Sequence, residues 1–203
     1  MLMNRTEKFF MNNPIRAAFT RWYEVPLLER LGGATRGLDV MEVGCGQGIG
    51  TEEILNRFGA RFVHALDLDP EMIDRARKRL GAYAPERIRL EVADVTALPA
   101  TDQRYDAVFD FAILHHVPNW QDAVTEIRRV LKPGGRFYFQ EVTSHALDKW
   151  FYRTFMLHPT ENRFSARQFV QELERQGLSL LGAPEERNGG DFVYGVAQRG
   201  NAG

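Results

Sequence analysis

Cysteine is almost missing from this chain of 203 residues, in which Cys45 is the only one. A single cysteine excludes an internal disulfide framework and any zinc cluster that needs several thiolates. No run approaches the roughly 20 consecutive apolar residues of a membrane-spanning helix, and the first residues lack the apolar core of a signal peptide. These absences predict a cytoplasmic protein without integral membrane association.

An excess of either charge is also missing, because 26 Lys and Arg face 27 Asp and Glu, a formal net charge of −1. This balance gives no electrostatic reason to expect a nucleic acid as the main partner. The acidic and histidine residues show no zinc-binding spacing, so no metal site is expected. The composition is 44% hydrophobic and 26% charged, which is typical of a folded globular chain.

Short β-rich segments alternate with helical patterns from about residue 38, as in a largely parallel α/β sheet. We expect strands at 38–43, 61–67, 88–93, 105–110, 136–142, 178–181 and 192–197. Helices are expected at about 51–58, 70–81, 121–131 and 165–176, the second capped by Asp69. The run Lys132-Pro133-Gly134-Gly135 should separate a helix from the fifth strand. The short connection at Gly189-Gly190 favours an antiparallel last strand.

Two aromatic segments, residues 1–37 and 143–164, lie outside this alternation. The second contains Trp150, Phe151, Tyr152, Phe155, Met156, His158 and Phe164. We interpret 1–37 as a helical cap and 143–164 as a lid over a pocket for an apolar or aromatic small molecule. Packing against the sheet edges, or a contact between two copies, is the alternative. Residues 38–142 and 165–203 would complete a single domain of unknown oligomeric state.

A glycine cluster, Gly44-Cys45-Gly46-Gln47-Gly48, ends the first predicted strand. Glycines at alternate positions allow a sharp turn and a close approach of backbone to a ligand. Asp67 ends the second predicted strand, 67 − 46 = 21 positions after Gly46. An acid at this offset can bind the ribose diol of a nucleoside-bearing cofactor in a doubly wound fold. A structural turn followed by an unrelated acid is the plainer alternative.

The residues around the loop also indicate the kind of cofactor. Ile49 stands where the dinucleotide pattern G-x-G-x-x-G needs its third glycine, and Glu42 lies two positions before the first glycine. A carboxylate beside the loop repels a pyrophosphate, because like charges repel strongly at short range. It suits a cationic cofactor without phosphate. S-adenosyl-L-methionine (SAM), with its sulfonium and ammonium groups, has this charge.

Five motifs in order resemble those of class I SAM-dependent methyltransferases, especially the small-molecule group that includes the ubiquinone and menaquinone methyltransferases. They are Val40 to Gly48, Leu66 to Met72, Ala93-Asp94-Val95, Leu114 to Val117, and Leu131 to Gly135. The resemblance implies a doubly wound, Rossmann-like α/β fold. Its seven strands would lie in the order 3-2-1-4-5-7-6, with an antiparallel last strand.

The resemblance also implies roles for individual residues. The glycine loop would pass under the methionine part of SAM, Asp67 would bind both ribose hydroxyls, and Asp94 would accept from the adenine amino group. Leu68 would pack on adenine. The resulting set of cofactor-binding candidates is Glu42, Gly44, Cys45, Gly46, Gly48, Asp67, Leu68, Met72, Ala93, Asp94, Val95 and Phe111.

Several candidates have plainer alternatives. Leu68 and Met72 could be core residues, Asp94 could cap a turn, and Cys45 is interpreted as a packing residue rather than a nucleophile. A general base is needed only for an acceptor that is protonated at neutral pH. By position, His116 and His115 are the candidates for a catalytic base, although a structural role for this pair is equally compatible with the sequence.

We therefore expect a SAM-dependent methyltransferase that acts on a small-molecule acceptor by in-line displacement. A SAM-binding module without catalysis would have the same loop and acid. A nicotinamide-dependent oxidoreductase is disfavoured by Ile49 and Glu42. A nucleic-acid amino-methyltransferase is disfavoured because Asp110-Phe111-Ala112-Ile113 replaces its Asp/Asn-Pro-Pro-aromatic tetrad. The sequence does not indicate the acceptor or the atom that is methylated.

Overall fold

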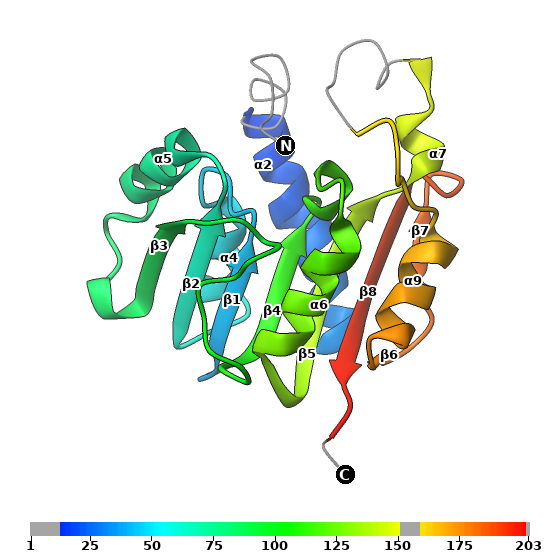
Figure 1. Cartoon of the computed structure of the whole chain (residues 1–203). Helices are drawn as coiled ribbons and strands as arrows, with labels where there is room; N and C mark the ends of the chain where they lie inside the picture. The colour runs from blue at the N-terminus through cyan, green and yellow to red at the C-terminus, as the bar shows by residue number, and fades with distance from the viewer. Residues whose placement is uncertain (1–12, 151–158, 202–203) are drawn as a thin grey trace.

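One sheet runs through the protein. The computed structural model describes residues 13–150 and 159–201. Its strands are β1 (Asp39–Val43), β2 (Phe62–Asp67), β3 (Ile88–Val92), β4 (Tyr105–Phe111), β5 (Leu131–Val142), β6 (Leu178–Leu180), β7 (Glu185–Arg187) and β8 (Phe192–Arg199). The order is β3-β2-β1-β4-β5-β8-β6, and β7 pairs with β8 (Figure 1). Apart from the short extra strand β7, this is the expected order.

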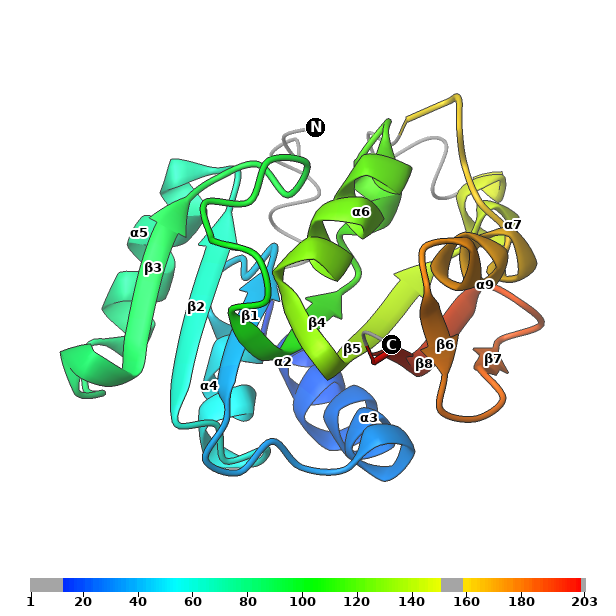
Figure 2. The same cartoon turned by 60° about the horizontal axis from the view of Figure 1, so that its bottom comes forward.

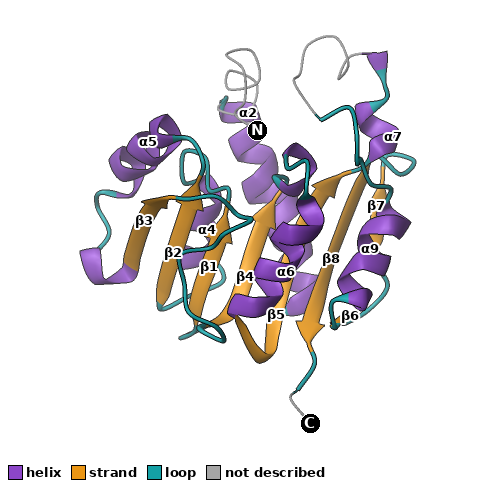
Figure 3. Cartoon of the chain, viewed as in Figure 1, coloured by secondary structure: helices purple, strands orange, loops and turns teal. Residues whose placement is uncertain are grey.

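Strand direction follows the lengths of the connections. Strands β1 to β5 pair in parallel, and each connection between them is long enough to cross over the sheet. Strand β8 pairs antiparallel with both β5 and β6, and its arrow points the opposite way in Figure 3. The antiparallel last strand is therefore confirmed.

Helices cover both faces of the sheet, so the central strands are buried on both sides. On one face lie α3 (Val25–Gly32), α4 (Ile49–Asn56) and α5 (Pro70–Leu80), packed on a cluster that includes Val40, Val63 and Phe109. On the other face lie α6 (Trp120–Val130) and α9 (Ala166–Arg175), packed around Phe139 and Val108. Figure 2 shows these two groups on opposite sides. This doubly wound arrangement is the expected fold class.

Two helix starts form as their sequences predict. Asp69 caps α5 by accepting from the backbone amide of Glu71, and Pro70 follows where a missing amide costs nothing. Ser165 caps α9 in a reciprocal capping box with Gln168. The cap at Asp69 places the start of α5 directly after β2, at the carboxyl end of that strand.

The described part of the segment before β1 is mainly helical, and residues 1–12 of the expected cap lie outside the described residues. It contains α2 (Pro14–Phe19), a π-helical turn η1 (Thr20–Glu24) and then α3. Arg16 holds α2 in place, donating to Glu24 at 2.5 Å, to Thr20 at 2.9 Å and to Gln140 of β5 at 3.5 Å. The N-terminal helices are thereby fixed over the end of β5.

The expected lid is described only in part. It begins with the short helix α7 (Ser144–Leu147), while Phe151, Tyr152, Phe155, Met156 and His158 lie outside the described residues. Trp150 and Trp22 are 73% and 74% exposed. Within the described ranges, no helix is both long and apolar enough to cross a membrane.

The break after α6 differs from its prediction in detail. Helix α6 ends at Val130, but β5 begins at once with Leu131 paired to Tyr105. The register then shifts, Gly134 adopts a φ of +75°, and regular pairing resumes at Arg136. The proline and glycines therefore form an irregularity inside the strand, where glycine supplies the left-handed conformation that the bend requires.

Candidate active site

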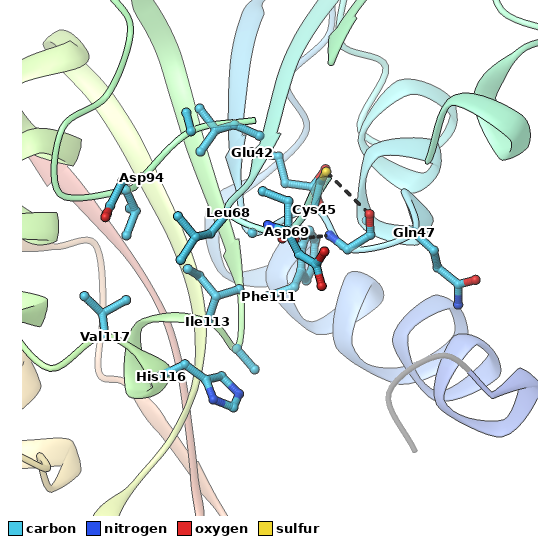
Figure 4. Close-up of a pocket in the computed structure, with 18 of the residues that line it drawn as sticks. Glu42, Cys45, Gln47, Leu68, Asp69, Asp94, Phe111, Ile113, His116 and Val117 are labelled. Atoms are coloured by element: carbon cyan, nitrogen blue, oxygen red, sulfur yellow. Dashed lines mark hydrogen bonds between the residues drawn. The ribbon is translucent and has the colours of Figure 1, made fainter. Parts of the chain in front are cut away.

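A cavity of about 210 Å³ opens at the carboxyl ends of β1, β2 and β4. Ligands in open α/β sheets bind at this edge, where the loops after the strands converge. Ten of the expected cofactor-binding residues line the cavity: Glu42, Gly44, Cys45, Gly46, Asp67, Leu68, Ala93, Asp94, Val95 and Phe111. Figure 4 shows several of them as sticks, together with lining residues that the sequence did not indicate.

The glycine loop meets different surroundings at each glycine. A Cβ on Gly44 would collide with Ile113, and one on Gly50 would collide with Glu42 and the Phe111 ring. At Gly46 the backbone is left-handed with a φ of +53°, and no atom of the described residues lies within 4 Å of where a Cβ would stand. Side chains thus close off the loop at Gly44 and Gly50, whereas at Gly46 it is open and forms a cradle for a ligand.

Asp67 lies beside this cradle. Its Oδ2 accepts from the Gly46 amide and its Oδ1 accepts from the Asp69 amide, both at 2.8 Å. These bonds fix the carboxylate at the cavity wall, and a carboxylate has about four lone-pair sites that can accept hydrogen bonds. A ribose diol supplies two hydrogen-bond donors.

Glu42 is buried at the base of the cavity, with 1% of its surface exposed. Thr51 of α4 donates a hydrogen bond to its Oε2. Burial raises the pKa of Glu42 to about 8, and the nearby carboxylates of Asp67 and Asp110 act in the same direction, against the Thr51 bond. A cationic ligand in the cavity would offset this destabilisation of the charged form.

The far end of the cavity is formed by the loops after β2 and β3. Leu68 is 42% exposed although it is a leucine, so it is not a core residue. Asp94 lines the cavity, and its Oδ1 also accepts from the amide and hydroxyl of Thr96, so it caps its own turn as well. An exposed apolar side chain beside an acidic acceptor suits a flat heteroaromatic ring with an amino group.

Three expected residues do not line the cavity. Gly48 begins α4 with a φ of +86° and packs against Leu80, and Met72 is fully buried in α5. His115 is also buried, with Nδ1 2.7 Å from Glu141 Oε2. The imidazole of His116 does line the cavity, from the 3₁₀ turn η3 (Leu114–His116).

Cys45 lines the cavity beside the loop and contacts the Gly46 carbonyl oxygen at 3.7 Å. Burial raises the pKa of its thiol well above the ordinary value, and the charges of Glu42 and Asp67 raise it further. The thiol is therefore protonated at neutral pH. This agrees with a packing residue and gives no support to a nucleophile.

Sequence reasoning missed the part of the wall that comes from distant segments. Arg16 and Thr20 reach the cavity from α2 and η1, and Ala112, Val117 and Asn119 reach it from the loop after β4. No local pattern around Arg16 indicates a site. Ala112 has a φ of +64°, a conformation that non-glycine residues rarely adopt and that recurs at functional sites, but it is visible only in the structure.

Comparison with known proteins agrees with this geometry. A family described as a methyltransferase domain matches residues 40–135, from β1 to the glycines near the start of β5. A probable S-adenosylmethionine-dependent methyltransferase of Mycolicibacterium smegmatis is 29% identical over 191 residues, which are 88% of this chain and 70% of that protein. These matches support a class I SAM-dependent methyltransferase.

Two further comparisons show how much of the chain is similar to known methyltransferases. Demethylmenaquinone methyltransferase of Tropheryma whipplei is 38% identical over 104 residues, 51% of this chain and 41% of that protein. A crystal structure of a SAM-dependent methyltransferase from Aquifex aeolicus has the same fold, with a TM-score of 0.74 at 20% identity over 96% of this chain and 97% of that one. The chain spans only 25% and 28% of the length of two other curated relatives.

The described residues fit SAM, the methyl donor of this family. The open cradle at Gly46 admits a ligand against backbone, Asp67 can accept from two hydroxyls, and Glu42 supplies a buried acid for a cation. Leu68 and Asp94 provide an apolar platform and an acceptor at the other end. The lining thus has polar groups suited to both ends of SAM and no cluster of cations for a diphosphate.

Replacing Asp67 by alanine is expected to weaken SAM binding 5- to 150-fold, which corresponds to about 1–3 kcal/mol for lost hydrogen bonds to a charged group. Asp67→Asn keeps one carbonyl acceptor, so its affinity for SAM should lie between those of wild type and Asp67→Ala. Asp74→Ala, at an exposed ion pair on α5, is the control and should leave the affinity unchanged. Isothermal titration calorimetry measures all three. Equal affinity of wild type and Asp67→Ala would refute the placement of the ribose.

The buried acid predicts a pH dependence. Because a bound cation favours the ionised carboxylate, SAM binding should lower the pKa of Glu42 from about 8 and release a proton. Affinity should therefore rise with pH, by up to about eightfold between pH 7 and 8.5. Glu42→Gln should remove this component while any titration of SAM itself remains. Identical calorimetric pH profiles for the two proteins would contradict it.

Proposed function

We propose that the protein transfers a methyl group from SAM to a small-molecule acceptor by in-line displacement. The observation that carries the proposal is the carboxylate of Asp67, anchored by the Gly46 and Asp69 amides at the wall of a cradle with Glu42 at its base. The sulfonium of SAM supplies an electrophilic methyl group and a good leaving group. The protein then has to bind, orient and exclude water, for which alignment alone is worth large rate factors.

The acceptor side of the cavity supports an apolar or aromatic compound. Phe111, Ile113 and Val117 provide apolar walls, and the polar side chains of the same segments are Arg16, Thr20, His116 and Asn119. This is the composition of small-molecule pockets in general. One relative acts, by its name, on demethylmenaquinone, a small molecule. Nothing in the lining favours a nucleic acid, since Arg16 is paired with buried Glu24.

Within this proposal His116 is the candidate general base, because its imidazole lines the cavity whereas that of His115 faces Glu141. The N-terminal helices and the segment 143–164 act as cap and lid of one domain, and the cytoplasm remains the proposed location. Gly48 and Met72 support the loop and α5 by packing and are left out of the proposed binding set.

The test is transfer of a radiolabelled methyl group from SAM to a panel of acceptors. The panel would contain lipophilic phenols, quinols, carboxylic acids and amines, with polar amino acids and a cell extract for comparison. We expect label in an apolar or aromatic small molecule. Label only in protein or RNA of the extract would refute the acceptor class, and binding of SAM with no transfer to anything would favour a non-catalytic SAM-binding module.

A further inference from the structure

Two acidic side chains lie fully buried on neighbouring strands beneath the cavity. Asp110 of β4 and Glu141 of β5 are each 0% exposed. Neither belongs to the set of residues that line the cavity. Burial of an ionised carboxylate is costly unless hydrogen bonds or a proton compensate for the lost water. The groups that offset the cost of burying each acid indicate the structural role of the pair.

Glu141 receives an unusual number of N–H donors. The Leu114 amide donates to its Oε1 at 2.6 Å, and the amides of Val142 and His115 donate to its Oε2 at 3.1 and 3.3 Å. The His115 ring adds Nδ1 at 2.7 Å from the same oxygen. Four donors directed at one carboxylate favour its charged form. The backbone of η3 is therefore bound to the end of β5 through this side chain.

Asp110 is compensated differently. Its Oδ1 accepts from the Ile113 amide at 3.0 Å, whereas its buried Oδ2 finds no donor among the described residues. Burial, and then the charge of Glu141, raises the pKa of Asp110 well above its usual range, while burial raises that of Glu141 to about 7. Ionisation of one of these two acids therefore disfavours ionisation of the other.

The turn held by these acids forms one wall of the cavity. It contributes Ala112, Ile113 and His116, and it contains the left-handed residue Ala112, whose backbone cannot keep that conformation without support. The Ile113 side chain fills the space above Gly44. Asp110 and Glu141 accept hydrogen bonds from the amides of this turn. The turn itself contacts the glycine loop through the Ile113 side chain. Opposite Glu141, β8 presents Val193 and no charged group.

We propose that Glu141 is a positioning residue that sets the turn 112–116 and, through Ile113, the glycine loop. This inference rests on the proposed function of the cavity. The imidazole of His116 packs against that of His115 with 4.2 Å between ring centroids and an interplanar angle of 39°, so Glu141 also orients the candidate base through His115. Removing the charge of Glu141 loosens the wall without touching any group that contacts a ligand.

Two near-isosteric substitutions on adjacent strands test the proposal. Glu141→Gln replaces one acceptor oxygen by an NH₂ group that faces amide donors. Asp110→Asn keeps the acceptor for the Ile113 amide and removes the ionisable group at position 110. Two readouts apply to both variants: amide hydrogen exchange of residues 113–116 by NMR, and calorimetric affinity for S-adenosylhomocysteine, the demethylated product of SAM. Global stability is measured in parallel by urea unfolding.

We expect Glu141→Gln to speed amide exchange at Leu114 and His115 at least tenfold more than at α9, and to weaken S-adenosylhomocysteine at least fivefold. Asp110→Asn should stay within about threefold of wild type in both. If Glu141→Gln does not fold, Glu141→Asp, which keeps the charge but withdraws it from the amides, is measured instead with the same expectation. Equal behaviour of the variants at positions 110 and 141 would overturn the proposal.

The two readouts separate this inference from the proposed function. Amide exchange needs no ligand, so it decides the role of Glu141 even if wild-type protein fails to bind S-adenosylhomocysteine. That failure would instead refute the proposed function. Faster exchange throughout the sheet, in proportion to lost global stability, would show a merely structural acid and would overturn the positioning role.

Discussion

Gly46→Val is expected to abolish detectable SAM binding while the chain stays folded. The Cβ of residue 46 would point into the open cradle, where no atom of the described residues lies within 4 Å, so the valine meets no protein atom there. It would instead occupy the space next to Asp67 that a bound ligand needs. We expect the affinity measured by calorimetry to fall more than 1000-fold, about 4 kcal/mol.

Gly37 offers a matched control for backbone strain. It has a φ of +72°, against +53° at Gly46, and again no atom of the described residues lies within 4 Å of a Cβ there, but it is exposed and far from the cavity lining. A valine costs conformational strain at both left-handed positions. Gly37→Val should therefore lose similar stability in urea unfolding and keep its affinity for SAM. Tight SAM binding by Gly46→Val would show that the loop does not contact the donor.

His116→Ala is expected to lower the rate of methyl transfer at least 100-fold for an acceptor whose attacking atom is protonated at neutral pH. A positioned general base typically contributes 10²–10⁴-fold, and His116 is the imidazole that the turn after β4 presents to the cavity. The affinity for SAM should change less than threefold. Single-turnover transfer to an acceptor identified by the radiolabel panel measures the rate without product release.

Two comparisons make this result specific. His145 lies on α7, is exposed, pairs with Asp191 and does not line the cavity. His145→Ala should therefore leave the rate unchanged. An acceptor that is already ionised, such as a carboxylate, needs no base and should react equally well with wild type and His116→Ala. Loss of transfer to both kinds of acceptor would mean that His116 shapes the cavity rather than moving a proton.

The sequence predicted the sheet well because its strongest determinants are local. Alternating segments, the capping pair Asp69-Pro70 and the short connection at Gly189-Gly190 each act over a few residues, and all three appear in the structure. The order of the strands came from family resemblance rather than from such patterns. The short strand β7 was missed because its three residues carry no apolar alternation and exist as a strand only by pairing with β8.

The candidate site also contains residues that local sequence could predict and residues that depend on packing between distant segments. The glycine loop, Asp67 and the loops after β2 and β3 follow strand ends in sequence, so their convergence on the cavity could be expected. Arg16 and Thr20 could not, because their position depends on how α2 and η1 lie against β5, where Arg16 donates to Gln140, 124 residues away in the chain. The pairing of Asp110 with Glu141 depends on the register of β4 against β5, which the sequence does not specify.

The most direct test of the account is a calorimetric titration of wild-type protein with SAM, S-adenosylhomocysteine and NAD. The central claim is that the cradle between Gly46 and Asp67, with Glu42 beneath it, holds a cationic donor without phosphate. The account predicts saturable one-to-one binding of SAM and S-adenosylhomocysteine and no binding of NAD. Binding of NAD in place of SAM would contradict it.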